Sequence, residues 1–238
     1  MPEITEAELA ATIDHAILAP NLTRADVDAQ LDIAREWGVF SVCVRPSDIA
    51  YAVERLAGSG VAVGTVIGFP HGTTSTAAKV AEVTQALADG AAEVDMVINI
   101  GWLRSGLDDL VVEDIRAVKE AAGDHITKVI LETSYLDDEQ VARGSRLTEA
   151  GGADFVKTST GFAGGGATVE HVKIMRANVG PAVQVKASGG VRSLATALEM
   201  LDAGATRLGT SGSATILGEL RTVLAGGEAS GAVDISSY

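Results

Sequence analysis

Short apolar runs of strand length alternate along the chain with longer segments of helical spacing. In one such segment Val80, Val83 and Leu87 fall on one face of a helix, while charged and polar residues take the other faces. No hairpin turn joins any apolar run to the next, so the runs are predicted to be strands connected by helices. The predicted strands are residues 13–18, 41–44, 62–67, 94–98, 128–131, 154–157, 182–186 and 206–209.

Signals for helix ends support the same alternation. The expected N-caps are Thr23, Ser47, Asp137 and Ser193, and glycines suited to helix C-termini stand at Gly38, Gly90, Gly123 and Gly151. Units of about thirty residues use almost the whole chain, which favours an α/β fold of the (β/α)8 TIM barrel type over a doubly wound sheet. No linker divides the chain, so we expect a single barrel domain over residues 1–225 and a flexible tail over residues 226–238.

The composition is that of a packed globular protein. Hydrophobic residues make up 47% and charged residues 21%, which excludes a disordered, collagen-like or disulfide-built chain. The longest nearly apolar run, residues 61–69, is about half of the ~20 residues needed to cross a bilayer, and the N-terminus lacks a basic leader pattern. We therefore expect a cytoplasmic protein with no membrane partner. The single cysteine, Cys43, lies in an apolar run, which favours burial over reactivity.

The net charge of −14 argues against nucleic acid or an anionic membrane as a partner, because both need a basic face. An anionic metabolite stays compatible if its site is locally positive, since distant charges are screened over ~8 to 10 Å. The histidines are scattered without metal-binding spacing, and no cysteine cluster accompanies them. We therefore expect no metal and no other cofactor.

Two lysines end neighbouring predicted strands, each after apolar residues: Lys157 and Lys186. The chemistry of a TIM barrel lies at the carboxyl ends of its strands, and two ammonium groups held together there favour the loss of one proton. A Schiff-base nucleophile needs a neutral amine, whereas a free lysine with a pKa of ~10.4 is almost wholly protonated at neutral pH. The pattern alone leaves open that both lysines are phosphate-binding or paired structural cations.

Glycine-rich loops follow the last two predicted strands and lead into predicted helices. One loop contains Gly189 and Gly190, and the other contains Ser211 and Gly212. Barrels frequently bind phosphate between these two loops, where backbone amides and helix N-termini meet an anion. A simple N-cap turn would explain either loop without any ligand. The loop of residues 161–166 is open to two interpretations, closure over a ligand or plain flexibility.

Other polar residues are expected at the same end of the barrel. They are Asp14, Asp95, Asn99 and Glu132, with Lys128 deeper, at the start of the fifth strand. Alternation along the strand places Asp95 on one face with Glu93. Asp95 is interpreted either as a proton carrier or as a counter-ion of the lysines, and Asp14 has the same two interpretations.

The motifs taken together resemble one enzyme family. Lys157-Thr-Ser-Thr-Gly161 with Lys186-Ala-Ser-Gly-Gly-Val-Arg192 is similar to the lysine motifs of deoxyribose-phosphate aldolases, class I aldolases built on the (β/α)8 barrel. The resemblance extends over nearly the whole chain. Further matching stretches are residues 13–18, 41–46, 64–70, 93–97, 128–133 and 209–211.

The resemblance implies a reversible cleavage of 2-deoxy-D-ribose 5-phosphate to D-glyceraldehyde 3-phosphate and acetaldehyde, without a cofactor. It implies that Lys157 forms the Schiff base, that Lys186 lowers the pKa of Lys157, and that Asp95 relays protons through an ordered water. The expected substrate and phosphate contacts are Asp14, Lys128, Thr160, Gly189, Gly190, Ser211 and Gly212. The expected partner is a small phosphosugar, and a homodimer stays open.

The chain departs from the family pattern at two places. Ala16-Ile-Leu-Ala-Pro20 stands where the family usually has Thr-Leu-Leu-Lys-Pro, so any substrate contact from that threonine hydroxyl is absent. Gly212 replaces a frequent serine, which weakens side-chain but not backbone donation. Two alternatives stay open: another Schiff-base aldolase for a different phosphosugar, and a non-catalytic phosphometabolite-binding barrel. The second would not need both lysines at one mouth.

The tail ends at Tyr238. Its twelve residues beyond Gly226 reach about 40 Å when extended at ~3.3 Å each, enough to return across the barrel. A phenol over the mouth could exclude water or pass a proton, in the manner of a lid. A solvated terminus without any role is the other interpretation.

Overall fold

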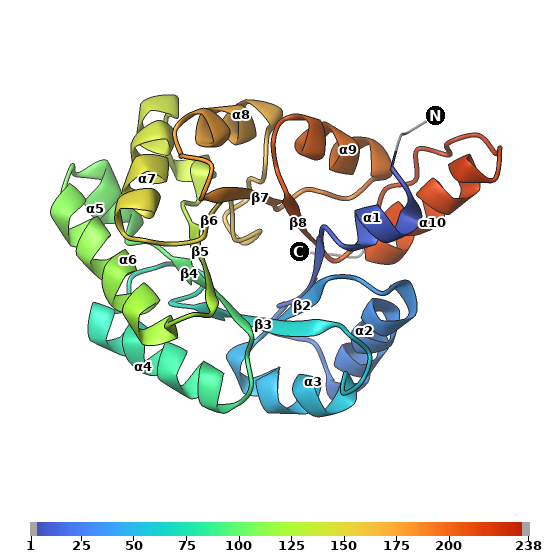
Figure 1. Cartoon of the computed structure of the whole chain (residues 1–238), viewed down its shortest axis with the longest axis horizontal. Coiled ribbons are helices and arrows are strands. Elements are labelled where there is room, and N and C mark those ends of the chain that lie inside the picture. Colours follow the sequence, from blue (N-terminus) through green and yellow to red (C-terminus); the bar gives the residue numbers. More distant parts are fainter. Residues whose placement is uncertain (1–3, 235–238) are drawn as a thin grey trace.

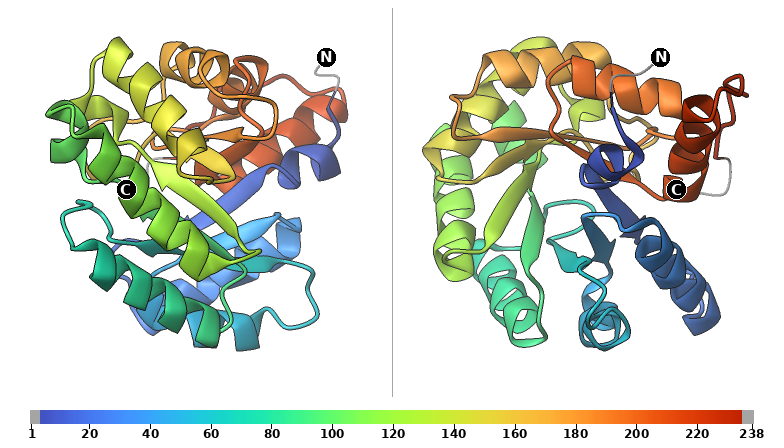
Figure 2. Two further views of the ribbon diagram at one scale, coloured as in Figure 1. Left: turned by 60° about the vertical axis from the view of Figure 1, so that its left-hand side comes forward. Right: turned by 45° about the vertical axis from the view of Figure 1, so that its right-hand side comes forward.

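Eight parallel strands close into a barrel in the order of the sequence, from β1 to β8 and back to β1. The structure is a computed structural model and describes residues 4–234. Figure 1 shows the strands at the centre with the helices around them, and the turned views in Figure 2 show the same helical layer outside the strands. The predicted (β/α)8 TIM barrel is thereby confirmed.

The strands agree with the predicted ones apart from small shifts at their ends. They are β1 (Ile13–Ile17), β2 (Ser41–Val44), β3 (Ala62–Ile67), β4 (Glu93–Val97), β5 (Ile126–Ile130), β6 (Phe155–Lys157), β7 (Gln184–Ser188) and β8 (Arg207–Thr210). The helices are α1 (Glu6–Ala10), α2 (Arg24–Trp37), α3 (Ile49–Arg55), α4 (Thr76–Ala88), α5 (Ile100–Arg104), α6 (Asp108–Ala122), α7 (Asp138–Ala150), α8 (Val169–Ala177), α9 (Leu194–Asp202) and α10 (Ser213–Leu224). Short 3₁₀ turns are η1 (Pro46–Asp48) and η2 (Thr133–Tyr135).

Local side-chain chemistry sets most helix ends where the sequence predicts them. Thr23 and Asp137 form capping boxes at α2 and α7, and Ser193 caps α9. Gly38 ends α2 in the left-handed conformation, at φ 58°, which glycine adopts without a steric penalty. These caps are confirmed.

Ser47 was wrongly predicted as an N-cap. Residues Pro46–Asp48 form the turn η1, and α3 begins one residue later, at Ile49. Proline favours the first position of a helical turn, so Pro46 starts the turn and encloses Ser47 within it.

Strand residues alternate between two environments. Outward-facing residues such as Val94 and Val129 are fully buried against the helices in one large apolar core. The barrel interior holds charged side chains, and beside them lies a small apolar cluster of Ala16, Leu18, Cys43 and Val66. Burying charge is costly unless every charged group is paired, so the interior is the place to look for chemistry.

The first and last helices of the chain, α1 and α10, lie side by side in the helical layer. Arg221 of α10 makes a two-bonded ion pair with Glu6 of α1, at 2.7 Å for both bonds, and Figure 2 shows these helices side by side. After α10 the tail turns back, and the amide of Asp234 donates to the carbonyl of Arg192 at 3.0 Å. Within residues 4–234, no helix is long and apolar enough to cross a membrane.

Candidate active site

Charged side chains fill the barrel interior. They are Asp14 on β1, Glu93 and Asp95 on β4, Lys128 on β5, Lys157 on β6, Lys186 on β7 and Arg207 on β8. None is more than 5% exposed. The strand register sets Lys157 directly beside Lys186, and Asp95 beside Lys128. The barrel therefore brings together residues that the sequence keeps far apart, including the two lysines of the paired motifs.

Asp95 is the centre of this cluster. Its Oδ2 accepts from the Nζ atoms of Lys157 and Lys186, both at 2.8 Å, and its Oδ1 accepts from the Nζ of Lys128 at 2.9 Å. Burial works to raise the pKa of Asp95, but the three lysines hold it well below its usual range. Asp95 is therefore ionised, and three ammonium groups share one carboxylate.

Of the three lysines in this cluster, Lys157 contacts the fewest carboxylates. Lys186 also pairs with Asp14 at 2.5 Å, and Lys128 also pairs with Glu93 at 2.6 Å, whereas the only carboxylate that Lys157 contacts among the described residues is Asp95. Burial, reinforced by the charge of Lys186, lowers the pKa of Lys157 against the attraction of Asp95. For Lys186, burial is outweighed by Asp14 and Asp95, which raise its pKa. The amine of Lys157 is therefore the one that loses its proton most readily.

Arg207 closes the floor of the cluster and was missed by the sequence reasoning. Its guanidinium donates to Asp14 through Nε at 2.8 Å and through Nη2, and to Glu93 Oε2 at 2.9 Å. The carboxylate of Asp14 also accepts from Ser41 Oγ at 2.7 Å. A signal was available, since Arg207 and Glu93 are charged residues at inward positions of otherwise apolar strands. The two substrate candidates Asp14 and Lys128 make their contacts inside this same cluster.

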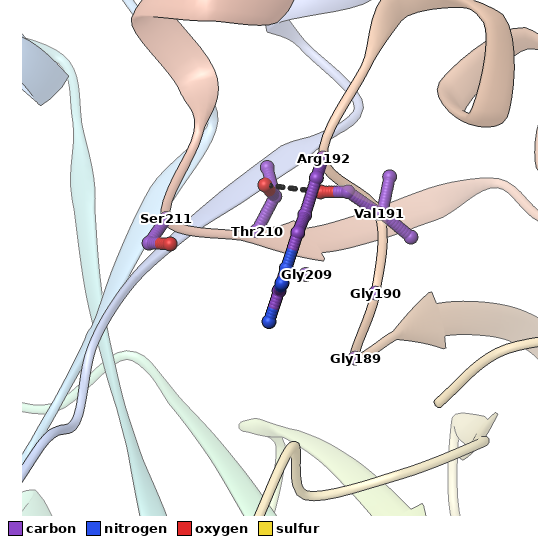
Figure 3. Close-up of a pocket in the computed structure, with 7 residues that line it drawn as sticks. All are labelled: Gly189, Gly190, Val191, Arg192, Gly209, Thr210 and Ser211. Carbon is purple, nitrogen blue, oxygen red and sulfur yellow. Dashed lines mark hydrogen bonds between the residues drawn. The ribbon is translucent and has the colours of Figure 1, made fainter. Parts of the chain in front are cut away.

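The loops after β7 and β8 face each other across a small pocket. Its lining is Gly189, Gly190, Val191, Arg192, Gly209, Thr210 and Ser211. Figure 3 shows the two loops as opposite walls, with the side chain of Arg192 extending between them. Within residues 4–234, the amides of Gly189, Gly190 and Ser211 donate to no other group. Both glycines have positive φ, 80° and 76°, so the loop needs glycine to turn here.

Gly212 differs from the other loop candidates. Its amide already donates to the hydroxyl of Thr210 at 2.9 Å. A Cβ at this position would meet the Cβ of Asp234 at 2.9 Å, so the returning tail fills the space that a larger residue would need. The tail thus lies beside the phosphate candidates. Tyr238, for which a lid was one of two interpretations, lies outside the described residues.

Thr160 and Glu132 form a buried pair at the ends of β6 and β5. Glu132 Oε2 accepts from the amide of Thr160 at 3.2 Å and from its hydroxyl. Burial raises the pKa of Glu132 against these hydrogen bonds. Glu132 also has φ 58°, a backbone conformation that residues other than glycine rarely adopt. Residues held in such conformations cluster at functional sites. The pair holds the segment that follows Lys157.

The mouth is apolar on the side of β1 to β3. A cavity of about 440 Å³ is lined by Leu18, Pro20, Arg45, Pro46, Val66, Gly68, Phe69, Pro70, Thr74, Glu82 and Phe162. Phe162, from the loop after β6, packs edge-on against Phe69 with ring centroids 5.3 Å apart. Burial raises the pKa of the Cys43 thiol below it to about 11, and its expected burial is confirmed. Ala16, where the family's threonine is missing, is buried with Leu18, Cys43 and Val66 beside this wall.

The histidines take no part in the cluster. His15 faces outward from β1 and is bonded to Ser213 Oγ at 2.8 Å and to Gln30 Oε1 at 2.7 Å. Burial lowers the pKa of His15 to about 4. Within residues 4–234, no three or more His, Cys, Asp or Glu side chains are arranged so that they could hold a metal ion.

Comparison with known proteins identifies the family of the chain. A family model described as DeoC/LacD family aldolase matches residues 9–219. Deoxyribose-phosphate aldolase 2 of Staphylococcus aureus strain MRSA252 is 54% identical over 208 residues, covering 87% of this chain and 94% of that protein. The deoxyribose phosphate aldolase of Aeropyrum pernix, solved as a tetramer, superposes with a TM-score of 0.83 at 29% identity, over 92% of this chain and 93% of that one. The chain therefore belongs to the DeoC/LacD family of aldolases.

Proposed function

We propose that this protein is a deoxyribose-phosphate aldolase that cleaves 2-deoxy-D-ribose 5-phosphate to D-glyceraldehyde 3-phosphate and acetaldehyde through a Schiff base on Lys157. The reaction is reversible. The observation that carries the proposal is the sharing of Asp95 among three lysines, which leaves Lys157 least able to keep its proton. By their names, the relatives described above are aldolases of deoxyribose phosphate.

The neutral amine of Lys157 attacks the C1 aldehyde, and loss of water gives an iminium. A proton leaves the C3 hydroxyl through a water toward Asp95, the C2–C3 bond breaks, and its electron pair enters the iminium to form an enamine. Glyceraldehyde 3-phosphate departs. Asp95 is a weak base because of its depressed pKa, so it holds the proton only briefly and returns it to C2 of the enamine. Hydrolysis then releases acetaldehyde and restores the amine.

Trapping tests the Schiff base directly. Acetaldehyde with borohydride should attach an ethyl group to Lys157, located by peptide mass mapping. Lys157→Leu should abolish the label and lower kcat/KM by more than about 10⁴-fold, as loss of a covalent nucleophile does. A label on Lys186 or Lys128 would overturn the assignment. Trapping without cleavage of 2-deoxyribose 5-phosphate would identify a Schiff-base aldolase for another phosphosugar.

The phosphate should bind the free amides of Gly189, Gly190 and Ser211, beside the N-termini of α9 and α10. Hydrogen bonds to a charged group contribute ~1.5 to 3 kcal/mol each, so 2-deoxyribose should react with a kcat/KM at least about 10²-fold below that of its 5-phosphate. Inorganic phosphate should compete with the phosphorylated substrate only. Equal kcat/KM values for the two sugars would contradict a phosphate site here.

A further inference from the structure

Arg207 lies on the barrel floor, away from the mouth. Its side chain is buried, and its guanidinium carbon lies 3.7 Å from the ring centre of Phe40 and 5.8 Å from that of Phe155. Its polar contacts are Asp14, Glu93 and, at 3.4 Å, Ser41. A guanidinium is always protonated in proteins, so Arg207 brings a permanent positive charge into the interior.

Two routes of ion pairs lead from Arg207 to Asp95. One runs through Asp14 and Lys186, and the other through Glu93 and Lys128. Both end on the carboxylate that Lys157 shares. Arg207 therefore touches neither the reacting lysine nor the mouth, but it binds the carboxylates that hold the other two lysines.

The charge count of the cluster depends on Arg207. The carboxylates are Asp14, Glu93 and Asp95, and the cations are Lys128, Lys157, Lys186 and Arg207. Without the guanidinium, three carboxylates would balance three ammonium groups. With it, the buried cluster carries one positive charge too many, and releasing one proton restores the balance. Desolvation makes such an excess charge costly, so the least compensated lysine gives up its proton.

Resting on the Schiff base proposed above, we propose that Arg207 is a positioning residue for this reaction: it holds Asp14 and Glu93 in place and supplies the buried charge that makes Lys157 release its proton. In the part of the chain that the structure describes, the titratable groups that interact with Lys157 are Asp95 from β4, Lys186 from β7, Cys43 from β2 and Glu132 from the end of β5. All of these remain in the variants described next.

The test is the pH dependence of acetaldehyde trapping, with the label located on Lys157. Arg207→Met should move the midpoint of the trapping rate to higher pH by about one unit. This is the order of pKa shift expected from one buried charge at this distance from Lys157. Arg207→Lys keeps the charge and should keep the midpoint. Glu93→Gln removes a carboxylate and should move the midpoint to lower pH. The double variant Arg207→Met with Glu93→Gln restores the count and should return the midpoint close to that of the parent.

Lys119→Met is the matched control for the change in net charge. Lys119 pairs with Asp154 at 2.8 Å on a partly exposed site, so its loss should leave the midpoint unchanged. If the parent protein carries the label elsewhere, the proposed function fails. If the label is on Lys157 but Arg207→Met has the parent's midpoint, or if Arg207→Lys shifts it equally, the role of Arg207 fails. Should Arg207→Met not fold, an unmoved midpoint in Glu93→Gln overturns the proposal just as well.

Discussion

Lys79 and Lys157 are both buried lysines bound to an aspartate, yet their surroundings differ in one respect. Lys79, on α4 outside the barrel, pairs with Asp114 of α6 at 2.5 Å and donates to the carbonyl of Val97 at 2.8 Å. No other described lysine or arginine contacts Asp114. Lys157 shares Asp95 with two further lysines.

The difference separates a structural lysine from the proposed nucleophile. Lys79 has a carboxylate to itself and ties two helices and a strand end together. An ammonium that competes for a shared carboxylate is desolvated without full compensation, which favours the neutral amine. Burial alone therefore does not mark a nucleophile. The number of cations that share each carboxylate does.

Stability should separate the two lysines first. Lys79→Met leaves Asp114 as an uncompensated buried charge and should lower the free energy of unfolding by about 3 to 5 kcal/mol. Lys157→Met removes the least compensated group of its cluster and should cost less than about 1 kcal/mol. Urea unfolding at neutral pH measures both values. Equal losses would show that sharing of the carboxylate does not distinguish these sites.

His15 extends the comparison to a buried group whose hydrogen-bond partners are neutral. The unfolded chain protonates this histidine below about 6.5, whereas the folded protein keeps it neutral down to about 4, so stability falls as pH drops between these values. The loss should reach about 3 kcal/mol. His15→Gln should flatten this part of the stability profile, and the exposed-site variant His125→Gln should not. A slope that survives in His15→Gln would assign the acid sensitivity to another group.

The smallest expected effect concerns Lys186. Its charge contributes to the lowered pKa of Lys157, so Lys186→Leu should raise that pKa and move the acid limb of the kcat/KM profile to higher pH by about one unit. At neutral pH the rate of iminium formation should fall about tenfold. Lys186→Arg keeps the charge and should restore the profile. An unchanged acid limb in Lys186→Leu would return Lys186 to a binding role.

The fold could be predicted well from sequence because its signals are local. Alternation of strand and helix patterns specifies a barrel, and caps such as Thr23 and Asp137 are decided within four residues of chain. The prediction of Ser47 as an N-cap was wrong because the neighbouring Pro46 begins the turn. The two lysines were found because a charged residue in an apolar strand is unusual in itself, although only Lys157 ends its strand and Lys186 lies in the middle of β7.

Sequence reasoning missed Arg207 because its role depends on partners that are far away in the sequence. It binds Asp14 across 193 positions of the chain and Glu93 across 114. The surroundings of Gly212 could not be predicted from sequence either. Its amide donates to Thr210, and Asp234 of the returning tail occupies the space beside it.

The sequence by itself determined the barrel, the end of the barrel where we propose the chemistry and the two lysines, since strand periodicity and motif spacing are properties of neighbouring residues. The tertiary structure alone decided which lysine lacks its own carboxylate. That choice follows from barrel closure, which pairs β8 with β1 and sets the register of β6 beside β7. Electrostatic competition acts through space over a few ångströms, so only the closed barrel brings the competing charges within reach of one another.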